Sequence, residues 1–570
     1  MKKFTFLLSL LLAFVGVTAS AQDLTISGAP EGENWAANTQ WYLIKVALTD
    51  DHHPYAAYLN TKSSHENGLL LTDVTVPTAD NGLWCIVGSE ADGYKLYNKA
   101  EGTSKVLGVG SWAKMYDVAG SDDVTKSFDF ANSSVAVNAK CVKLHGKTDG
   151  DYWWNNNDGT ACHLSNWKDN NYSHVGTIGN AFYFIPVSDV EGVSEGITAF
   201  SKQIVLDRYQ VIPGVATSCA TEKAAWENAK TEDNYNAYLA SMKSYLNNTY
   251  YRITNCKKDD YKVLAANKTK AACVENAQKM SNASTLWKFI PFEDRGVKLY
   301  NANVEAYLAG LVNPVQEPVT PMNADLTLGG LYNIIVNTCG NVQGFVLCDG
   351  ENGRMNMEGK GGIDKWEGQS GHFDQVTWTI DVATDLEVAL NAVNGKSYAT
   401  TYLPVGVSAV QDAKAYVAAA PVNNETVMTE TASFGAKTGV LLVSDNAADK
   451  AVLTIGDATS VTSALSGTLL AKDITDQTNY LVFGKNKDNA NEVGFFEPSA
   501  SVASIPANRA FFTGAAGAIA LNFGGNVTAI DQVVNNANVN APIFDLAGRR
   551  VVKAAKGGVY IQNGKKFIVK

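Results

Sequence analysis

The residues best suited to chemistry lie between positions 149 and 171, where tryptophans alternate with amides and carboxylates. Trp153 and Trp154 are adjacent, and adjacent side chains on a β-strand point to opposite faces, so at least one indole should face outward. A sugar presents apolar C–H faces and rings of hydroxyls, which suit an aromatic plate edged by Asp oxygens and Asn amides. The pattern predicts a carbohydrate-binding site made of Asp151, Trp153, Trp154, Asn155, Asn157, Trp167 and Asn170.

A second interpretation of this stretch stays open: one Trp packs the end of a hairpin, and the Asn run only turns the chain. Solvent exposure of Trp153 or Trp154, with Trp167 nearby, separates the two interpretations. A similar but less complete set of residues occurs later in the chain, around Asp349, Asn352 and Trp366. It predicts a second site that binds glycan more weakly.

Two motifs that could carry catalysis or a metal are interpreted as structure. Gly192–Gly196 fits G-x-S-x-G, but a nucleophile elbow needs a parallel sheet and a downstream acid and His. Only His372 follows, and the surroundings have antiparallel periodicity, so we predict a turn between domains. The run Asp50–His53 has metal-ligating side chains, but it falls where the first hairpin should turn, which predicts a solvated loop.

Other catalytic signatures are missing from the sequence. It contains no H-E-x-x-H and no Gly-rich phosphate loop followed by Lys and Ser or Thr. The paired carboxylates of glycoside hydrolysis are close in space but not in sequence, so spacing along the chain does not reveal them. We therefore predict no catalytic residues, no metal and no cofactor, in a protein that is not an enzyme.

Length and composition limit the classes of protein to consider. A chain of 570 residues is too long for one growing core, so several domains are expected. Charged residues make up only 18%, and together with 48 Gly this composition indicates a β-rich chain. The formal net charge of −11 repels polyanions, which argues against nucleic acid as a partner.

The N-terminus has the order of a secretory signal peptide, predicted to cover residues 1–21. Lys2 and Lys3 precede an apolar run, Phe4–Val17, and Ala19-Ser20-Ala21 is a small-residue cleavage site. No later stretch is apolar for long enough to span a bilayer. The mature chain is expected to begin at Gln22 and to be exported, either free outside the cell or held at the outer-membrane surface.

Eight Cys are too few for a disulfide scaffold in a chain of this length. Export permits bridges, and the local pairs Cys141–Cys162 and Cys339–Cys348 could close hairpins. Buried free thiols are the equal alternative, and the sequence leaves both open.

One phrase occurs twice. Residues 83–98 and 286–301 align without a gap as L-W-x-[IF]-[VI], five residues, then G-x-K-L-Y-N. Apolar residues alternate, turn signals intervene, and alternation resumes, which predicts strand, turn, strand with the Trp on the buried face. We predict that Trp84 and Trp287 are equivalent core residues of one repeated module.

Around the first copy, three units of roughly 45 residues each hold about four short strands, which must pack about one axis to bury their faces. Three such units closing on themselves give a β-trefoil. The pattern resembles ricin-type lectin domains, in the form found in surface proteins of host-associated Gram-negative anaerobes, over residues 36–188 and 249–385. The family's Q-x-W signature is absent, since Gly82 and Thr285 stand two residues before the repeated tryptophans.

Three further segments complete the predicted architecture. Residues 219–246 have apolar residues at helical spacing, which predicts one or two helices in a linker between the trefoils, residues 197–248, or, alternatively, a partner-binding helix. Residues 386–526 have short strands at about ten-residue spacing, typical of an antiparallel β-sandwich, and resemble a spacer domain of the same surface proteins. Residues 527–570 form a basic tail of three short strands, similar to the C-terminal sorting signals of type IX secretion.

The sequence therefore predicts a mainly β protein with two β-trefoils, a short helical linker, a sandwich and a small C-terminal β segment. Its predicted function is non-catalytic, lectin-like binding of host or dietary glycans. The first alternative is an adhesive or structural surface protein whose trefoils bind a protein partner. The weakest alternative is a cryptic glycoside hydrolase.

Overall fold

The computed structural model is mainly β, with several sheets, and describes residues 23–568 with gaps. The gaps are residues 50–51, 63, 66–67, 121–123, 148–151, 157–161, 169–175, 258–260, 313–319, 340–341, 350–352, 360, 367–372, 488, 490–491, 515–516, 525–541, 547, 553 and 563–564. The chain divides into two compact units, Met1–Glu387 and Val388–Lys570. Within the described ranges, every helix is too short or too polar to cross a membrane.

Six strands near the start of the first unit pair into a closed ring, which we call the first ring. Every pair is antiparallel, and the last strand pairs with the first, so no edge is left free. In order around the ring the strands are β1 (Trp41–Val46), β4 (Trp84–Ser89), β5 (Gly93–Asn98), β8 (Phe128–Asn132), β9 (Lys140–Leu144) and β12 (Phe182–Val187). Three strand pairs are inserted along the chain: β2 (Ser64–His65) with β3 (Gly68–Leu69), β6 (Lys105–Val109) with β7 (Ala113–Asp117), and β10 (Trp153–Asn156) with β11 (Leu164–Trp167).

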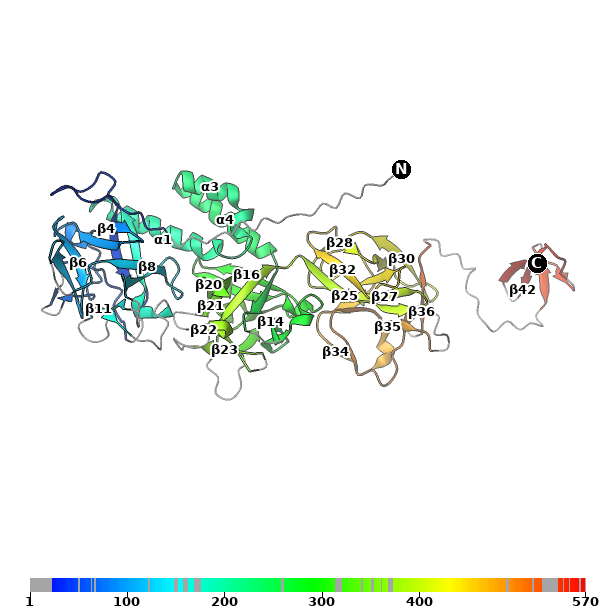
Figure 1. The fold of residues 1–570 in the computed structure, drawn as a ribbon. Coiled ribbons are helices and arrows are strands. Elements are labelled where there is room, and N and C mark those ends of the chain that lie inside the picture. Colours follow the sequence, from blue (N-terminus) through cyan, green and yellow to red (C-terminus); the bar gives the residue numbers. More distant parts are fainter. Residues whose placement is uncertain are drawn as a thin grey trace, which may run out of the picture. The chain divides into compact units, whose positions relative to one another are not determined.

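The same unit contains a second ring with the same order of pairing. Its strands are β13 (Tyr251–Asn255), β16 (Trp287–Phe292), β17 (Gly296–Asn301), β20 (Tyr332–Cys339), β21 (Val342–Asp349) and β24 (Thr377–Val382). The inserted pairs are β14 (Tyr261–Ala266) with β15 (Lys270–Glu275), β18 (Ala306–Leu308) with β19 (Thr320–Asn323), and β22 (Gly353–Glu358) with β23 (Gly362–Trp366). The two rings are separate closed ladders, so each encloses its own core (Figure 1).

The tryptophans of the repeated phrase occupy equivalent buried positions in the two rings. Trp84 and Trp287 are both 0% exposed. The indole N–H of Trp84 donates to the carbonyl of Leu59 at 2.8 Å, and that of Trp287 donates to the carbonyl of Leu264 at 2.9 Å. A buried indole needs such a partner for its N–H, so the predicted equivalence of the two residues is confirmed.

The Asn that ends the phrase also has an equivalent role, which the sequence did not predict. It lies opposite the repeated Trp across each hairpin and is completely buried in both rings. Asn98 donates to the carbonyl of Asn81 at 2.9 Å, and Asn301 donates to the carbonyl of Ser284, the matching position in the second ring, at 2.7 Å. Each buried amide thereby has a backbone carbonyl group as its hydrogen-bond partner.

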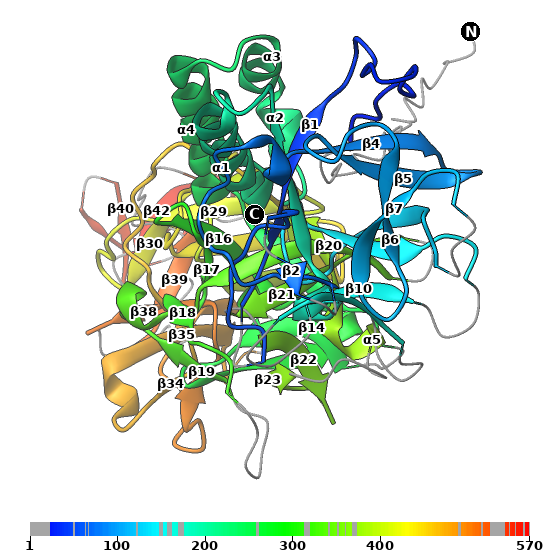
Figure 2. The same cartoon turned by 90° about the vertical axis from the view of Figure 1, so that its left-hand side faces the viewer.

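Four helices lie between the rings along the chain: α1 (Val193–Gln210), α2 (Val215–Ser218), α3 (Ala220–Asn228) and α4 (Glu232–Asn248). Figures 1 and 2 show α3 and α4 side by side. Gly192–Gly196 is the beginning of α1, so the expected turn between domains is wrong. A helix forms here in place of a turn because α1 packs directly on β12. A side chain in place of Gly196 would meet the carbonyl oxygen of Pro186 at 2.5 Å.

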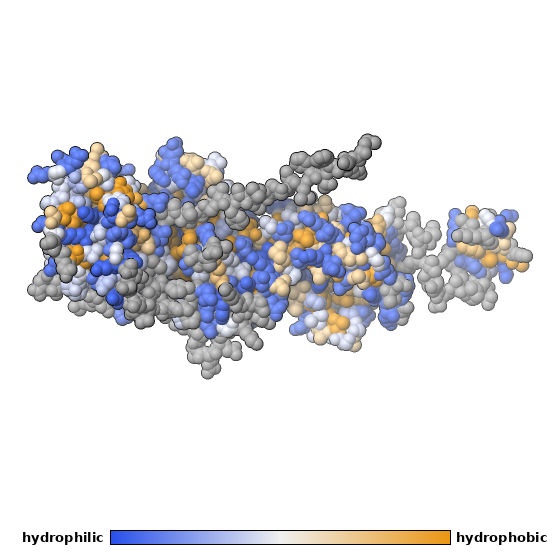
Figure 3. Space-filling model, in the orientation of Figure 1, coloured by the Kyte–Doolittle hydropathy of each residue, from blue (hydrophilic) through white to orange (hydrophobic). Residues whose placement is uncertain are grey.

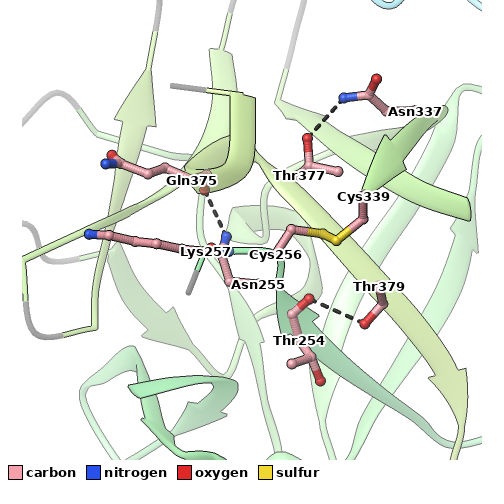
Figure 4. Close-up of a disulfide and its surroundings, with 9 residues drawn as sticks. All are labelled: Thr254, Asn255, Cys256, Lys257, Asn337, Cys339, Gln375, Thr377 and Thr379. Atoms are coloured by element: carbon pink, nitrogen blue, oxygen red, sulfur yellow. Dashed lines mark hydrogen bonds between the residues drawn. A yellow bond between two sulfur atoms is a disulfide. The ribbon is translucent and has the colours of Figure 1, made fainter. Parts of the chain in front are cut away.

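A disulfide joins Cys256, just after β13, to Cys339, the last residue of β20 (Figure 4). Neither expected local pair forms, and Cys141, Cys162 and Cys348 are buried thiols outside any disulfide. Cys339 and Cys348 lie on paired strands but far apart in their register. The expectation of buried thiols thus holds for these residues, while the true bridge is long-range.

The second unit contains a ten-stranded sheet. Its order is β26 (Asn391–Val393), β27 (Lys396–Thr401), β31 (Val440–Ser444), β29 (Lys414–Ala418), β30 (Glu425–Thr431), β39 (Ile519–Asn522), β36 (Val493–Phe496), β35 (Tyr480–Lys485), β38 (Arg509–Thr513) and β33 (Ser466–Thr468). Two small sheets accompany it: β25 (Asp385–Ala389), β32 (Lys450–Ile455) and β28 (Val407–Gln411), and β34 (Lys472–Asp473) with β37 (Ser504–Ile505). The strands β30 and β39 are parallel, so wholly antiparallel pairing is wrong; a pair so distant in sequence has no hairpin to set its direction.

The C-terminal tail forms a separate sheet with one strand more than the three expected. Its strands are β40 (Ile543–Asp545), β41 (Arg550–Val551), β42 (Val559–Gln562) and β43 (Lys565–Ile568). The expected first strand is split by a turn in which Gly548 has φ +79°, a conformation that suits glycine.

A short α5 (Phe373–Val376) precedes β24, and 3-10 turns occur at Asp80–Gly82, Ile178–Asn180, Asn276–Gln278, Ala283–Thr285, Leu326–Leu328 and Gln477–Asn479.

Candidate carbohydrate-binding site

Trp154 belongs to the core of the first ring. It is 0% exposed, and its ring packs edge-on against Phe128 at 5.2 Å and against Phe182 at 5.8 Å between centroids. Both phenylalanines lie on strands of the ring, so β10 places this indole inward. Trp154 therefore supports the fold and does not face a ligand.

Trp153 points to the other face of β10, as alternation requires, but it is also buried, with 8% exposure. It lies opposite Trp167 on β11, and the Lys143 ammonium lies over its ring at 5.9 Å from the centroid. The expectation that Trp153 or Trp154 is open to solvent is wrong. The reason is that β10 has paired strands on both sides, whose long side chains cover its second face.

The remaining residues of the predicted site divide into two groups. Asn155 is buried and donates from Nδ2 to Oδ1 of Asn180 at 2.8 Å, so its amide takes part in an internal contact. Trp167 is half-buried. The others, Asp151, Asn157 and Asn170, lie outside the described residues. The hairpin thus brings the tryptophans and Asn155 together, without an exposed aromatic plate in the part of the hairpin that is described.

The other candidate residues predicted from the sequence do not form an exposed site among the described residues either. Asp349 accepts the backbone N–H of Leu311 at 2.5 Å, and burial raises the pKa of its carboxyl. Trp366 is half-buried, and Asn352 lies outside the described ranges, as do the two acids of the Asp50–His53 run. Among the residues that the structure does describe, no group of three His, Cys, Asp or Glu is placed to hold a metal ion.

A different cavity, of about 610 Å³, opens on the first ring. It is lined by residues of β5, β8 and β9, by Glu90 in the turn between β4 and β5, by His145 just after β9, and by the N-terminal segment 23–26. Carboxylates, an imidazole, an ammonium and two aromatic rings share this space. Such a mixture of apolar walls and a few convergent polar groups is typical of a small-molecule site.

Two aromatic rings form the apolar part of this cavity. Tyr94 on β5 and Phe130 on β8 have centroids 5.4 Å apart, and both side chains are half-buried. Each ring therefore keeps a partly accessible surface, unlike the indoles of β10.

The polar part is organised by an acid and an imidazole. Asp129 Oδ1 lies 2.8 Å from Nδ1 of His145, and both side chains remain partly exposed. Gly93 permits this arrangement, because it has φ +76° and a Cβ there would lie 2.6 Å from Cγ of His145. The pair fixes the ring of His145 and directs its other nitrogen away from the acid.

Lys140 adds a cation on β9. Its Nζ donates to Oδ1 of Asn132 at 2.7 Å, and burial lowers the pKa of its ammonium, while the charge of Asp23 raises it. The cavity therefore offers groups that accept hydrogen bonds and groups that donate them, which sugar hydroxyls require in combination.

This site was not predicted from the sequence, although a signal was present. Phe128-Asp129-Phe130 is an alternating strand with an acid between two aromatic residues. Alternation places Asp129 on the face opposite Phe128 and Phe130. Phe128 is fully buried, whereas Phe130 is half-buried, packs against Phe184 of the core and lines the cavity from that side. The sequence does not show that His145 lies next to Asp129, because that proximity depends on the pairing of β8 with β9.

Comparisons with known proteins do not assign the chain to a family. No protein-family model matches it, and no curated protein matches it.

Solved structures with partial likeness include a mosquitocidal holotoxin, at 11% identity over 85% of this chain and 51% of that one, with a TM-score of 0.26. This chain thus spans about half the length of the holotoxin. A ricin B-like lectin from Macrolepiota procera, in complex with lactose, matches at 17% identity over 24% of this chain and 95% of that chain, with a TM-score of 0.19. An endo-β-galactosidase from Clostridium perfringens that releases GlcNAcα1-4Gal matches at 8% identity over 63% of this chain and 70% of that chain, with a TM-score of 0.21. At these scores the function has to be argued from the residues themselves.

Proposed function

We propose that the protein is a non-catalytic, lectin-like carbohydrate-binding protein whose two rings are β-trefoils. Each ring has six strands, with three inserted strand pairs, which is the number that three four-stranded units supply. The equivalent Trp and Asn contacts in the two rings support a common module.

The observation that carries the proposal is the cavity beside Asp129 and His145. Its volume, about 610 Å³, falls in the range of small-molecule sites, about 300–1,000 Å³. The rings of Tyr94 and Phe130 supply apolar surface for the C–H face of a sugar, and the carboxylate and imidazole bind its hydroxyls. The site replaces the β10 hairpin as the location of binding.

The expected affinity is low. Each hydroxyl hydrogen bond contributes about 0.5–1.5 kcal/mol net, and a few of them with ring stacking must offset the loss of ligand freedom. A single site should therefore bind with a free energy of roughly −4 to −6 kcal/mol, in the millimolar to high-micromolar range. A second site on the same chain would raise the apparent affinity for a surface that presents many glycans.

We further propose that the protein is exported and displayed at the cell surface, where host or dietary glycans are its partners. The signal-peptide order of residues 1–21 supports export. The Cys256–Cys339 disulfide supports it independently, because such bonds persist in oxidising compartments. The separate tail sheet, β40–β43, is the proposed sorting element.

A glycan array with the mature protein tests the binding proposal. The informative variant is Asp129→Asn, which keeps the shape of the side chain but removes the charge that organises His145. Its matched control is Asp117→Asn, the same change on an exposed residue of β7 outside the cavity. We expect Asp129→Asn to lose at least about tenfold in binding, since a hydrogen bond to a charged group contributes roughly 1.5–3 kcal/mol, and Asp117→Asn to bind as the parent does.

Three results would count against parts of this proposal. Equal glycan binding by Asp129→Asn and the parent would place the site elsewhere. Release of reducing sugar from a bound glycan would contradict the non-catalytic role. Capture of one surface protein without any glycan signal would favour the adhesive alternative; hydrophobic and hydrophilic side chains are interspersed over most of the face drawn in Figure 3, which does not favour protein docking there.

A further inference from the structure

The ten-stranded sheet of the second unit curls until strands near its two ends touch. Strand β27 lies next to one end and β38 next to the other. The backbone N–H of Tyr402 donates to the carbonyl of Asn508 at 3.1 Å, and the amide of Asn508 donates back to the carbonyl of Tyr402 at 3.2 Å. The N–H of Ala510 donates to Oγ1 of Thr400 at 3.3 Å. The seam is therefore closed at this point by a few local contacts.

Beside this seam lies a cavity of about 370 Å³. Its walls come from β26, β27, β35, β36, β37 and β38. Most of the lining is apolar, including Val393, Tyr398, Phe483, Val493 and Ile505. The rings of Tyr398 and Phe483 contact each other within this wall, with centroids 5.6 Å apart. A cavity with such walls favours an apolar chain or ring over a hydrated ligand.

Two cations line this apolar space, Lys485 and Arg509, and Arg509 is the more buried of them. Arg509 is half-buried, and its guanidinium donates to the carbonyl of Thr400 at 3.0 Å. In the part of the chain that the structure describes, it forms no ion pair with an acid. Burial lowers the pKa of its guanidinium, and no neighbouring carboxylate raises it. A partly desolvated charge without a counter-ion is costly, and an anionic ligand would remove that cost.

We propose that this cavity binds a small carboxylate with an apolar tail or ring, held by its carboxylate at Arg509. The planar fork of Arg matches a carboxylate through two parallel hydrogen bonds. The valines, Ile505 and the two aromatic rings then enclose the apolar part. Lys485 is exposed at the rim and is too well hydrated to be the main anchor. This ligand class differs from the carbohydrates proposed for the first ring, and the inference does not depend on that site.

The test is isothermal titration calorimetry with the mature full-length protein and two probes that share one tail, decanoate and decan-1-ol. The parent should bind decanoate about 10- to 100-fold more tightly than decan-1-ol, the ratio expected from hydrogen bonds to a charged group. Arg509→Gln should abolish that preference and leave the binding of decan-1-ol unchanged. Lys485→Gln, which removes a rim charge, should keep the preference.

The comparison of the two probes on the parent protein does not depend on any variant, so it remains decisive if Arg509→Gln does not fold. Equal affinity for the acid and the alcohol would overturn the proposal. Unchanged decanoate binding by a folded Arg509→Gln would overturn it as well, as would the absence of saturable decanoate binding below about 1 mM.

Discussion

Raising the pH through about 6 should weaken the packing of helix α1, because it ionises the buried carboxyl of Asp207. Asp207 is 4% exposed and accepts amide hydrogens from Asn138, from Gln203 at 2.9 Å, and from Gln210. Burial raises the pKa of this carboxyl to about 6, and the amide bonds and the charges of Lys230 and Lys223 only partly oppose it. Desolvation of the Asp207 carboxylate therefore raises its pKa by more than the hydrogen bonds from the amides lower it.

The sign and size of the effect follow from the two pKa values. An ordinary Asp has a pKa of 3.8, so between 3.8 and about 6 the folded state holds a proton that the unfolded state has lost. The free energy of opening should fall as the pH rises through this window and should be constant above it. A difference of about two units corresponds to roughly 3 kcal/mol, at 1.36 kcal/mol per unit.

Hydrogen exchange of α1 peptides, followed by mass spectrometry and corrected for intrinsic rates, measures this opening free energy locally. Asp207→Asn is a neutral mimic of the protonated carboxyl, and its opening free energy should not depend on pH in this window. Asp233→Asn, at an exposed position of α4, is the matched control and should behave as the parent does.

An opening free energy of α1 that rises between about pH 4 and pH 6 would refute this reasoning. It would mean that the amides stabilise the carboxylate more than burial destabilises it.

Four other predictions concern folding and export. Trp287→Ala should lower stability by about 3–5 kcal/mol, read as a lower urea midpoint; an unchanged midpoint would contradict its core role. Replacing Cys256 and Cys339 together by Ser should cost up to about 4.5 kcal/mol in the same assay, because the bond closes a loop over a separation of 83 residues. Mass spectrometry of exported protein should find Gln22 at the N-terminus, and a retained leader would contradict cleavage there. Deleting residues 527–570 should abolish surface display, measured by antibody labelling of intact cells, while glycan binding stays intact; unchanged display would remove the proposed role of the tail.

The repeated phrase could be predicted because its information is local. Alternation alone assigns Trp84 and Trp287 to a buried face, and repetition shows that the assignment holds twice. The Asn partners Asn98 and Asn301 were visible in the same phrase. Their role was not, because it depends on which carbonyl groups the hairpin buries.

The candidate site could not be predicted because exposure is decided by packing between strands, which alternation within a single strand does not specify. Alternation correctly separates Trp153 from Trp154, but it does not say that β9 and β11 cover the second face. The contact of Asp129 with His145 depends on the pairing of β8 with β9, and the bond between Cys256 and Cys339 requires the second ring to bring the ends of β13 and β20 together. Local pattern determines which face a residue takes, and tertiary pairing decides whether that face meets water.

Ring closure has a consequence for how the chain folds. In the first ring, Trp41 at the start of β1 pairs with Val187 at the end of β12, and β12 also pairs with β9. Contacts between residues so distant in sequence form late and slowly, because closing the long loop loses conformational entropy before strand pairing provides any stabilisation. Until β12 is available, β1 presents an unpaired backbone edge, and β9 is paired with β8 and, at Lys143, with β10. A chain interrupted shortly before residue 182 therefore has nearly all of the ring's strands and an open seam between β1 and β9, so it should associate with its neighbours, whereas six more residues would close that seam.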